Sequence, residues 1–279
     1  MKHVPSRHDL YHLSLSSRAF QADAEYFLYR HLESSRWPRT EDLCLLVIRS
    51  PRLHPLVRSL SITNEGMKLP PSPKYWDCIS KLLMYLPNLT SLKIYNGLSM
   101  ANSNSWVLDK CIASLRRVEV DFELDNHFIN FLVNQPLLTQ IHWINSSRQD
   151  VSSVVIQSLQ SLSPSPSRFL PLASEVMTNC CPFAVYLLNS ARVTHLWLWG
   201  HAPDEDGGVP QLITQFTDRA MTLRSLRINF PLRKRMCIAI LTELVQRVPK
   251  LRSIGFLPYF DANVCFLLLL LMSLDQITI

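Results

Sequence analysis

The chain has 279 residues, of which 47% are hydrophobic and 18% are charged, and its net charge is +6. These values are typical of a folded globular protein and exclude an intrinsically disordered chain. The length is enough to bury a sizeable core in one or two domains. The seven cysteines show no CxxC spacing, which favours free thiols in a reducing compartment, so we expect a cytoplasmic or nuclear protein.

The first segment, residues 1–36, differs from the rest of the chain and predicts two short helices. One runs from Asp9 to about Ser17 and the other from Gln21 to about His31, and we expect the second helix to end near Leu32. Apolar residues recur along both helices at helical spacing. We therefore assign residues 1–36 to a helical segment and residues 37–279 to a separate array of repeats.

A short motif recurs through residues 37–279: an apolar residue, two mixed residues, an apolar residue, one mixed residue and an apolar residue. Its copies are Val57-Leu60-Ile62, Leu89-Leu92-Ile94, Leu115-Val118-Val120, Leu138-Ile141-Trp143, Val193-Leu196-Leu198, Leu223-Leu226-Ile228, Leu251-Ile254-Phe256 and Leu274-Ile277-Ile279. Four copies are also close in sequence, namely LVRSLSI, NLTSLKI, TLRSLRI and KLRSIGF. A self-similar period of about 20 to 30 residues indicates a repeat solenoid.

The spacing of the copies predicts about nine units. Most steps between middle residues are 23 to 32 residues long, but the step from Ile141 to Leu196 is 55 residues, which suits two units with a degenerate copy near Phe169-Leu172. Within each motif, residues two apart point to the same face of a strand, so Leu60 and Ile62 face inward while the residues between them face outward.

Helical patterns separate the motifs. We expect helices from Lys74 to Leu86, from a cap at Asp125 or Asn126 to Pro136, over residues 212–220 and 238–248, and from Asp261 to Met272. Strand and helix alternate, which predicts an α/β fold: a curved leucine-rich-repeat-like solenoid with a parallel sheet and outer helices. An ordinary α/β domain with leucine-rich strands is the alternative.

The turn after each strand lacks the residue that leucine-rich repeats usually place there. The position three residues after the last apolar strand residue holds Asn or Cys in the usual repeat. Here these positions hold Glu65, Gly97, Glu123, Ser146, His201, Pro231 and Tyr259. We therefore expect an irregular array without a polar ladder.

The N-terminal segment resembles the second half of an F-box. The matching phrase is Asp9-Leu10, then Leu13-Ser14-Leu15-Ser16-Ser17-Arg18-Ala19-Phe20, followed by a helix that ends Leu28-Tyr29-Arg30-His31-Leu32. A full F-box opens with a Leu-Pro-containing helix, which has no counterpart here. With the downstream phrases SPRLHPLVRSLSI, LPNLTSLKI and VTHLWLWG, the whole chain looks like the F-box and leucine-rich-repeat proteins of fungi.

This resemblance implies a substrate receptor of an SCF-type ubiquitin ligase. In that family the F-box docks on a Skp-family adaptor, which links it to the cullin ligase, and the repeats hold the protein substrate. The residues here that match the adaptor-facing and core positions are Leu10, Leu13, Leu15, Arg18 and Phe20. The alternative is that the helices only cap the first repeat, which leaves a repeat scaffold without a ubiquitin-ligase link.

The outward strand positions form the predicted concave face, where we expect the protein substrate to bind. They include Lys93, Tyr95, Arg117, Glu119, Asp121, Gln140, His142, His195, Trp197, Trp199, Arg227 and Asn229. Exposed tryptophans beside arginines have the composition of an interface hot spot. A loop folded over Trp197 and Trp199 is the alternative.

The sequence offers no recognisable catalytic site. Its six glycines build no phosphate-binding loop, and no HExxH motif or paired Cys/His spacing predicts a metal site. We therefore expect a non-enzymatic protein with no cofactor and no membrane span. We also expect no nucleic-acid partner, because the only tight basic cluster is the short one at residues 233–235. An enzyme remains an alternative if Glu119, Asp121 and His142 converge in a cleft.

Overall fold

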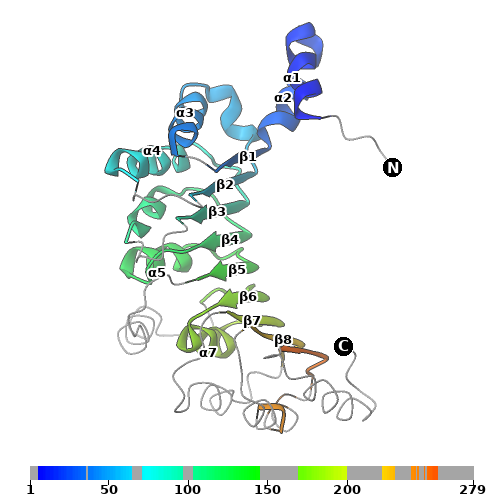
Figure 1. Cartoon of the computed structure of the whole chain (residues 1–279), viewed down its shortest axis with the longest axis vertical. Helices are drawn as coiled ribbons and strands as arrows, with labels where there is room; N and C mark the ends of the chain where they lie inside the picture. The colour runs from blue at the N-terminus through cyan, green and yellow to red at the C-terminus, as the bar shows by residue number, and fades with distance from the viewer. Residues whose placement is uncertain are drawn as a thin grey trace.

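The computed structural model describes residues 6–35, 37–64, 71–96, 103–144, 169–199, 222–229, 240–242, 244, 248 and 250–256. Nine strands form a single parallel sheet in which each strand pairs with the next one along the chain (Figure 1). The strands are β1 (His31–Ser34), β2 (Ser59–Thr63), β3 (Ser91–Tyr95), β4 (Arg117–Val120), β5 (Gln140–Trp143), β6 (Glu175–Thr178), β7 (His195–Trp199), β8 (Ser225–Asn229) and β9 (Ser253–Phe256). This order is that of a solenoid, as the repeats predict.

Helices connect the strands and cover one face of the sheet. They are α1 (Arg7–Ser16), α2 (Arg18–Tyr29), α3 (Trp37–Ile48), α4 (Pro73–Leu83), α5 (Asn126–Val133) and α7 (Cys181–Ser190), with the 3₁₀ helices η1 (Pro51–Leu56) and η2 (Ser105–Lys110). In Figure 1, α3, α4, α5 and α7 lie on one side of the stacked strands, whereas α1 and α2 lie at the N-terminal end of the stack, beyond β1. The face away from the covering helices is called the open face below.

Equivalent motif positions pair with one another across the sheet. Leu60 pairs with Leu92, Leu92 with Val118, and Val118 with Ile141, and all four side chains are buried. The predicted strand phase is therefore confirmed for these repeats. Because a shift of one residue would turn every leucine to the open face, burial of one face holds the register.

Local sequence starts the helices where the pattern predicts. The Asp125 carboxylate accepts the backbone N–H of Phe128 at 2.9 Å and caps α5, and the Ser72 hydroxyl accepts the N–H of Tyr75 at 3.3 Å and caps α4. Pro73 occupies the first turn of α4, where its missing N–H costs nothing. Ser6 and Asp9 form a reciprocal capping box at the start of α1.

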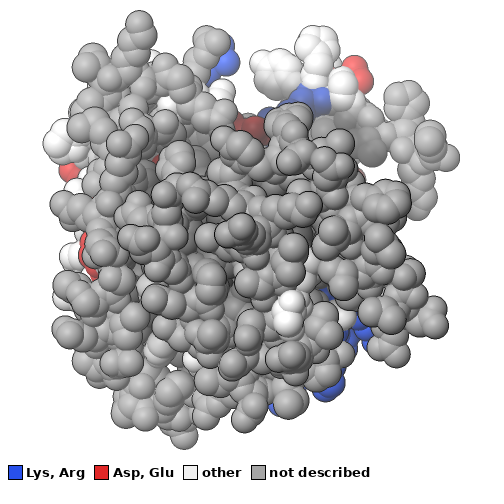
Figure 2. Space-filling model, turned by 60° about the horizontal axis from the view of Figure 1, so that its bottom comes forward, with Lys and Arg blue, Asp and Glu red and all other residues white. Residues whose placement is uncertain are grey.

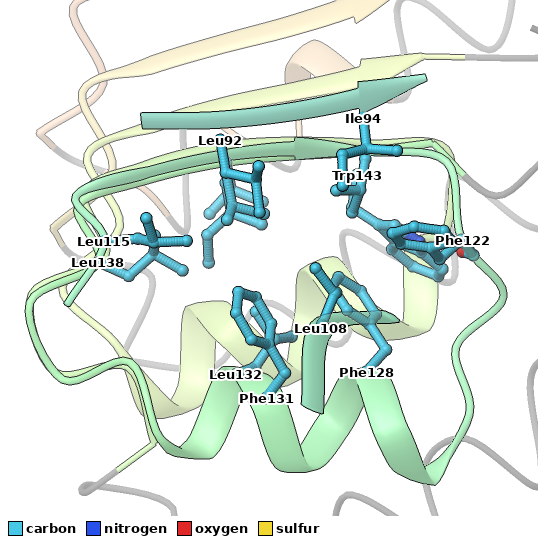
Figure 3. Close-up of a cluster of buried hydrophobic side chains, with 14 of the residues drawn as sticks. Leu92, Ile94, Leu108, Leu115, Phe122, Phe128, Phe131, Leu132, Leu138 and Trp143 are labelled. Carbon is cyan, nitrogen blue, oxygen red and sulfur yellow. The ribbon is translucent and has the colours of Figure 1, made fainter. Parts of the chain in front are cut away.

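The core fills the space between the strands and the covering helices. Figure 3 shows Leu92 and Ile94 of β3 facing Phe128, Phe131 and Leu132 of α5. Trp143 of β5 is fully buried, donates its indole N–H to the Phe122 carbonyl at 2.8 Å, and packs edge-on against Phe183 of α7 with ring centroids 5.0 Å apart. A single continuous core therefore runs along the solenoid.

The degenerate repeat lies a few residues later than we expected. Its strand is β6, in which Val176 pairs with Ile141 on one side and with Leu196 on the other. The motif is thus Ala173-Val176-Thr178 rather than the region near Phe169-Leu172. The small Ala173 and the polar Thr178 hide the motif in the sequence, although both are fully buried like the leucines they replace.

The sheet begins inside residues 1–36. The expected helix through Leu32 is wrong: α2 ends at Tyr29, and His31–Ser34 form β1, which pairs with β2. The reason is the alternation of the strand, because Leu32 and Ser34 face the core while His31 and Glu33 face solvent. The hydroxyl oxygens of Ser34 and Thr40 are 2.8 Å apart and form a hydrogen bond inside that core.

A polar ladder exists, contrary to the expectation that it is absent. Asn64 and Asn96 follow β2 and β3 by one residue and are buried, and Asn64 Nδ2 donates to Asn96 Oδ1 at 3.4 Å. Asp121 continues the ladder by accepting the backbone N–H of Asn96 at 2.7 Å. The ladder therefore occupies positions one or two residues earlier than in the usual repeat.

Several sequence predictions lie outside the described residues. These are the last motif at Leu274-Ile277-Ile279, the helices over residues 212–220 and from Asp261 to Met272, and the basic cluster at residues 233–235. Of the predicted helix over residues 238–248, residues 240–242, 244 and 248 are described. Ile240, Leu244 and Val248 are buried, Leu241 is half-buried and Thr242 is exposed, as expected of a helix with one buried face.

Candidate functional site

The open face presents residues in rows, and the first row and the central row each contain one residue from each of the strands β2 to β9. The first row contains Ser59, Ser91, Arg117, Gln140, Glu175, His195, Ser225 and Ser253. The central row contains Ser61, Lys93, Glu119, His142, Met177, Trp197, Arg227 and Gly255. Because neighbouring parallel strands lie about 4.8 Å apart, the members of a row are close enough to interact.

A charged network joins the open face from β3 to β6. Glu119 accepts a hydrogen bond from Arg117 Nε at 2.7 Å and lies 3.4 Å from Lys93 Nζ. On its other side, His142 Nδ1 lies 3.7 Å from Glu119, and His142 Nε2 lies 3.2 Å from Glu175. Each carboxylate of this network therefore has basic or amide groups within reach.

The environment of Glu119 favours its ionised form. Partial burial acts to raise the pKa of Glu119, but the charges of Arg117 and Lys93, the Arg117 hydrogen bond and His142 outweigh it, so this pKa lies below its ordinary value of 4.5. Glu175 also accepts a hydrogen bond from Gln140 Nε2 at 2.9 Å. The centre of the open face is therefore electrostatically neutralised within the chain.

Aromatic side chains continue the central row toward β8. The rings of His142 and Trp197 are nearly parallel, with centroids 6.4 Å apart, and Arg227 Cζ lies 4.7 Å from the Trp197 ring centroid on the next strand. Trp199, in the same strand, exposes 46% of its surface. An arginine stacked on a tryptophan, with a second tryptophan exposed beside it, is a suitable contact surface for another protein.

The residues that we predict to bind the substrate lie on the open face. All of them are half-buried or exposed: Lys93, Tyr95, Arg117, Glu119, His142, His195, Trp197, Trp199 and Arg227. Glu175 and Met177 belong to the same surface but were missed, because the strand that carries them was placed too early. Reading Ala173-Val176-Thr178 as a motif copy would have found both residues. That these side chains bind a substrate stays a prediction.

Asp121 was expected on this surface, and that expectation is wrong. Its side chain is 2% exposed and its carboxylate binds backbone in the polar ladder. Glu119, Asp121 and His142 therefore do not converge in a cleft, which the enzyme alternative required. Among the residues of known placement, no three His, Cys, Asp or Glu side chains are grouped to hold a metal ion.

The described cysteines are free thiols in buried or half-buried positions. Burial raises the pKa of Cys44 far above its ordinary value, and it raises the pKa of Cys181 to about 11. Because the thiolate is the reactive form, neither thiol is suited to nucleophilic chemistry at neutral pH.

A shallow pocket opens where β6, β7 and β8 begin. Its volume is about 550 Å³, and its lining includes Pro171, Leu172, Leu188, Ala191, Arg192 and Thr222. The walls are mainly apolar, and Arg192 is the only charged group among the described residues that line it. The pocket has no signal in the sequence, because it depends on three segments meeting at one edge of the sheet.

The predicted adaptor-facing residues divide into one buried and four exposed side chains. Leu10 is 7% exposed and packs inside the α1–α2 pair, whereas Leu13, Leu15 and Phe20 expose 39%, 66% and 52% of their surface. Arg18, the first residue of α2, is also exposed. The structure therefore leaves most of this set accessible to a partner.

Within the described part of the chain, no helix has the length and apolar character that a bilayer span requires.

Comparison with known proteins gives a likeness in fold. No protein-family model matches the chain, and no curated protein sequence matches it. Among solved structures, the leucine-rich repeat-containing protein LegL7 from Legionella pneumophila matches with a TM-score of 0.51 and 13% sequence identity, over 95% of this chain and 89% of that chain. At this identity the likeness concerns the fold alone. The chain therefore has a leucine-rich-repeat-like α/β fold.

Proposed function

We propose that the chain is a non-enzymatic protein-interaction module that serves as an F-box-type substrate receptor of an SCF ubiquitin ligase. In this proposal, α1 and α2 bind a Skp-family adaptor, which connects to the cullin ligase, and the open face binds the protein substrate. The receptor does no bond chemistry. It acts in the cytoplasm or nucleus by raising the effective concentration of the substrate near the ligase.

The apolar surface of α1 and α2 is the observation that carries the adaptor proposal. Leu13, Leu15, Phe20 and Phe27 expose between 39% and 66% of their surface on two adjacent helices. Several large apolar side chains exposed on two short helices favour a partner-binding surface, and these four residues are called the apolar patch below. Three of these residues also lie at positions of the F-box resemblance, which is the reason to name a Skp-family adaptor as that partner.

Specific contacts attach the two helices to the solenoid. Arg7 donates to the carbonyl oxygen of His31 at the start of β1, and Arg52 pairs with Glu25 of α2 at 2.8 Å. Glu25 is five residues after Phe20 and two residues before Phe27, so it lies on a different face of α2 from these two aromatic rings. The attached side and the apolar side are therefore different, and an adaptor on the apolar side would be held in a fixed relation to the open face.

Co-purification with a recombinant Skp-family adaptor tests the proposal. Leu13→Asp and Leu15→Asp place a charge in the apolar patch and should abolish retention, because a desolvated carboxylate at an interface has no partner. Leu46→Asp is the matched control, because Leu46 exposes 48% of its surface on α3, away from the patch. Circular dichroism should show the same folded spectrum for all three variants.

The outcome of this experiment separates two readings. Retention of the wild type and of Leu46→Asp, with loss of both patch variants, supports the receptor. Failure of the wild type to retain the adaptor, or retention of all variants alike, contradicts it.

A repeat scaffold without a ubiquitin-ligase link is the second candidate. The observation that favours it is the position of α1 and α2 beyond β1, the first strand of the sheet (Figure 1). Solenoids need capped ends, and these helices are placed where a cap would be. In that case truncation of residues 1–29 lowers the thermal stability, and the adaptor does not bind to the full chain.

A further inference from the structure

The C-terminal part of the described sheet carries positive charge that none of the described carboxylates neutralises. Four cations lie in the segments that lead into β7, β8 and β9, and all four are exposed: Arg192, Arg224, Lys250 and Arg252. We call these four residues the basic edge. None of them takes part in an ion pair within the described ranges, where Glu175 is the only carboxylate from residue 169 to residue 256.

Two of these cations are stacked at equivalent positions of neighbouring repeats. Arg224 immediately precedes β8 and Arg252 immediately precedes β9, and the Arg252 N–H donates to the Arg224 carbonyl at 2.8 Å. Like charges opposite each other on adjacent strands repel. An anion bound between the two side chains would remove that repulsion. Figure 2 shows blue Lys and Arg side chains at its lower right margin.

The basic edge differs in charge from the middle of the sheet, and this difference would keep an acidic ligand at the edge. On β4 and β6, Glu119 and Glu175 are surrounded by Arg117, Lys93, His142 and Gln140, so these charges are already matched. An acidic ligand that moved toward β4 would meet these two carboxylates instead of free cations. The attraction is therefore confined to the end of the sheet from β7 to β9.

The shallow pocket lies at the same edge and adds an apolar contact. Arg192 lines it, and so does Thr222, two residues before Arg224. Leu172 exposes 51% of its surface and forms part of its apolar wall with Pro171. A pocket of about 550 Å³ is within the usual range for a small ligand or for one or two side chains of a peptide.

We infer that the basic edge and its pocket bind an acidic protein segment, with an apolar side chain in the pocket and carboxylates on Arg192, Arg224 and Arg252. The inference rests on the proposed function, because it names the partner chemistry of the solenoid's binding surface. A protein segment fits better than a nucleic acid. A continuous phosphate backbone that extended along the open face would meet Glu175 and Glu119, whereas a short acidic peptide would end before them.

Selection from a random display library of 12-residue peptides on the full chain tests this inference. The enriched peptides should be rich in Asp and Glu and should contain a large apolar residue. Binding of a labelled enriched peptide should weaken at least tenfold in Arg192→Glu/Arg224→Glu/Arg252→Glu. It should weaken threefold or more in Leu172→Ser, and strongly when Asp and Glu in the peptide are replaced by Asn and Gln.

The matched control is Arg49→Glu/Lys74→Glu/Lys81→Glu, which changes the net charge equally at exposed positions after α3 and on α4. It should bind the peptide like the wild type. Selection that yields no enriched peptides, peptides without acidic residues, or peptides that bind both triple variants equally overturns the inference. Tighter binding of a 12-residue dT oligonucleotide than of the peptide, lost in the basic-edge variant, overturns it in favour of nucleic acid.

Adaptor retention measured on the same variants keeps the two proposals distinguishable. The basic-edge variant should still retain the Skp-family adaptor, because its substitutions lie far from α1 and α2. If the wild type fails to bind the adaptor but still selects acidic peptides, only the ubiquitin-ligase role is contradicted.

Discussion

At the residue scale, the buried ends of β2 to β4 depend on a few polar side chains. The Asp121 carboxylate accepts the Asn96 N–H, and Asn64 links Asn96 to the Tyr75 hydroxyl, which donates to Asn64 Oδ1 at 3.1 Å. These bonds give buried polar groups partners inside the fold. Buried polar groups without partners cost more than the bonds themselves contribute, so the ladder is a sensitive part of the fold.

Replacement of Asp121 by alanine tests the ladder. We expect Asp121→Ala to lower the free energy of unfolding by about 1–3 kcal/mol, because it leaves the buried N–H of Asn96 without its acceptor. Asp77→Ala is the control, because Asp77 is exposed on α4, and it should change stability by less than about 0.5 kcal/mol. Urea denaturation of both variants measures this, and equal stability of the two would refute a structural role for Asp121.

Glu119 gives the open face a defined pH dependence. Its pKa lies below the ordinary value of 4.5 in the folded chain, so ionised Glu119 stabilises the fold above about pH 4.5. That contribution is lost as the pH falls through the lower, folded-state pKa. We expect Glu119→Gln to be about 1 kcal/mol less stable than the wild type at pH 7. The difference should shrink below pH 4.5, and a gap that is constant with pH would contradict this account.

At the element scale, Trp143 connects consecutive repeats. Its ring packs against Phe183 of α7 and lies 6.1 Å from the Phe128 ring of α5, while its N–H binds the Phe122 carbonyl. We expect Trp143→Phe to lose about 1–3 kcal/mol of unfolding free energy, because it leaves a cavity and an unbonded carbonyl. Trp199→Phe is the matched control on the open face and should be nearly neutral. Similar losses in both variants would refute the special role of Trp143.

The elements that the sequence predicted are those with strong alternation or clear caps. Leu60 and Ile62, or Leu92 and Ile94, define their strands because an apolar residue stands at every second position. Asp125 caps α5 as expected. β6 could not be placed, because Ala173 and Thr178 are buried by their neighbours rather than by their own hydrophobicity. β1 was hidden because His31–Ser34 has a single large apolar residue and directly follows a helix.

The candidate surfaces were predicted in part. Strand phase alone placed Trp197, Trp199 and Arg227 on one face, because the side-chain period of a strand is fixed. The pocket and the basic edge could not be predicted in this way. Arg192 and Thr222 are 30 residues apart in the chain and meet only because their repeats stack.

At the scale of the whole molecule, the two proposed binding surfaces are separate. The apolar patch of α1 and α2 lies at one end of the strand stack, and the basic edge lies near the other end, with the neutralised network between them (Figure 1). In a solenoid each repeat contacts mainly its neighbours, so binding at one end need not disturb the other. This separation is what a receptor requires if it holds an adaptor and a substrate together.

Hydrogen–deuterium exchange of the full chain, with and without a saturating Skp-family adaptor, tests the central claim most directly. We predict slower exchange within residues 7–29, where α1 and α2 lie, and unchanged exchange in β4 to β8. Leu13→Asp should abolish the effect. Unchanged exchange in residues 7–29, or slowing confined to the strands, would contradict the assignment of these helices as the adaptor-binding surface.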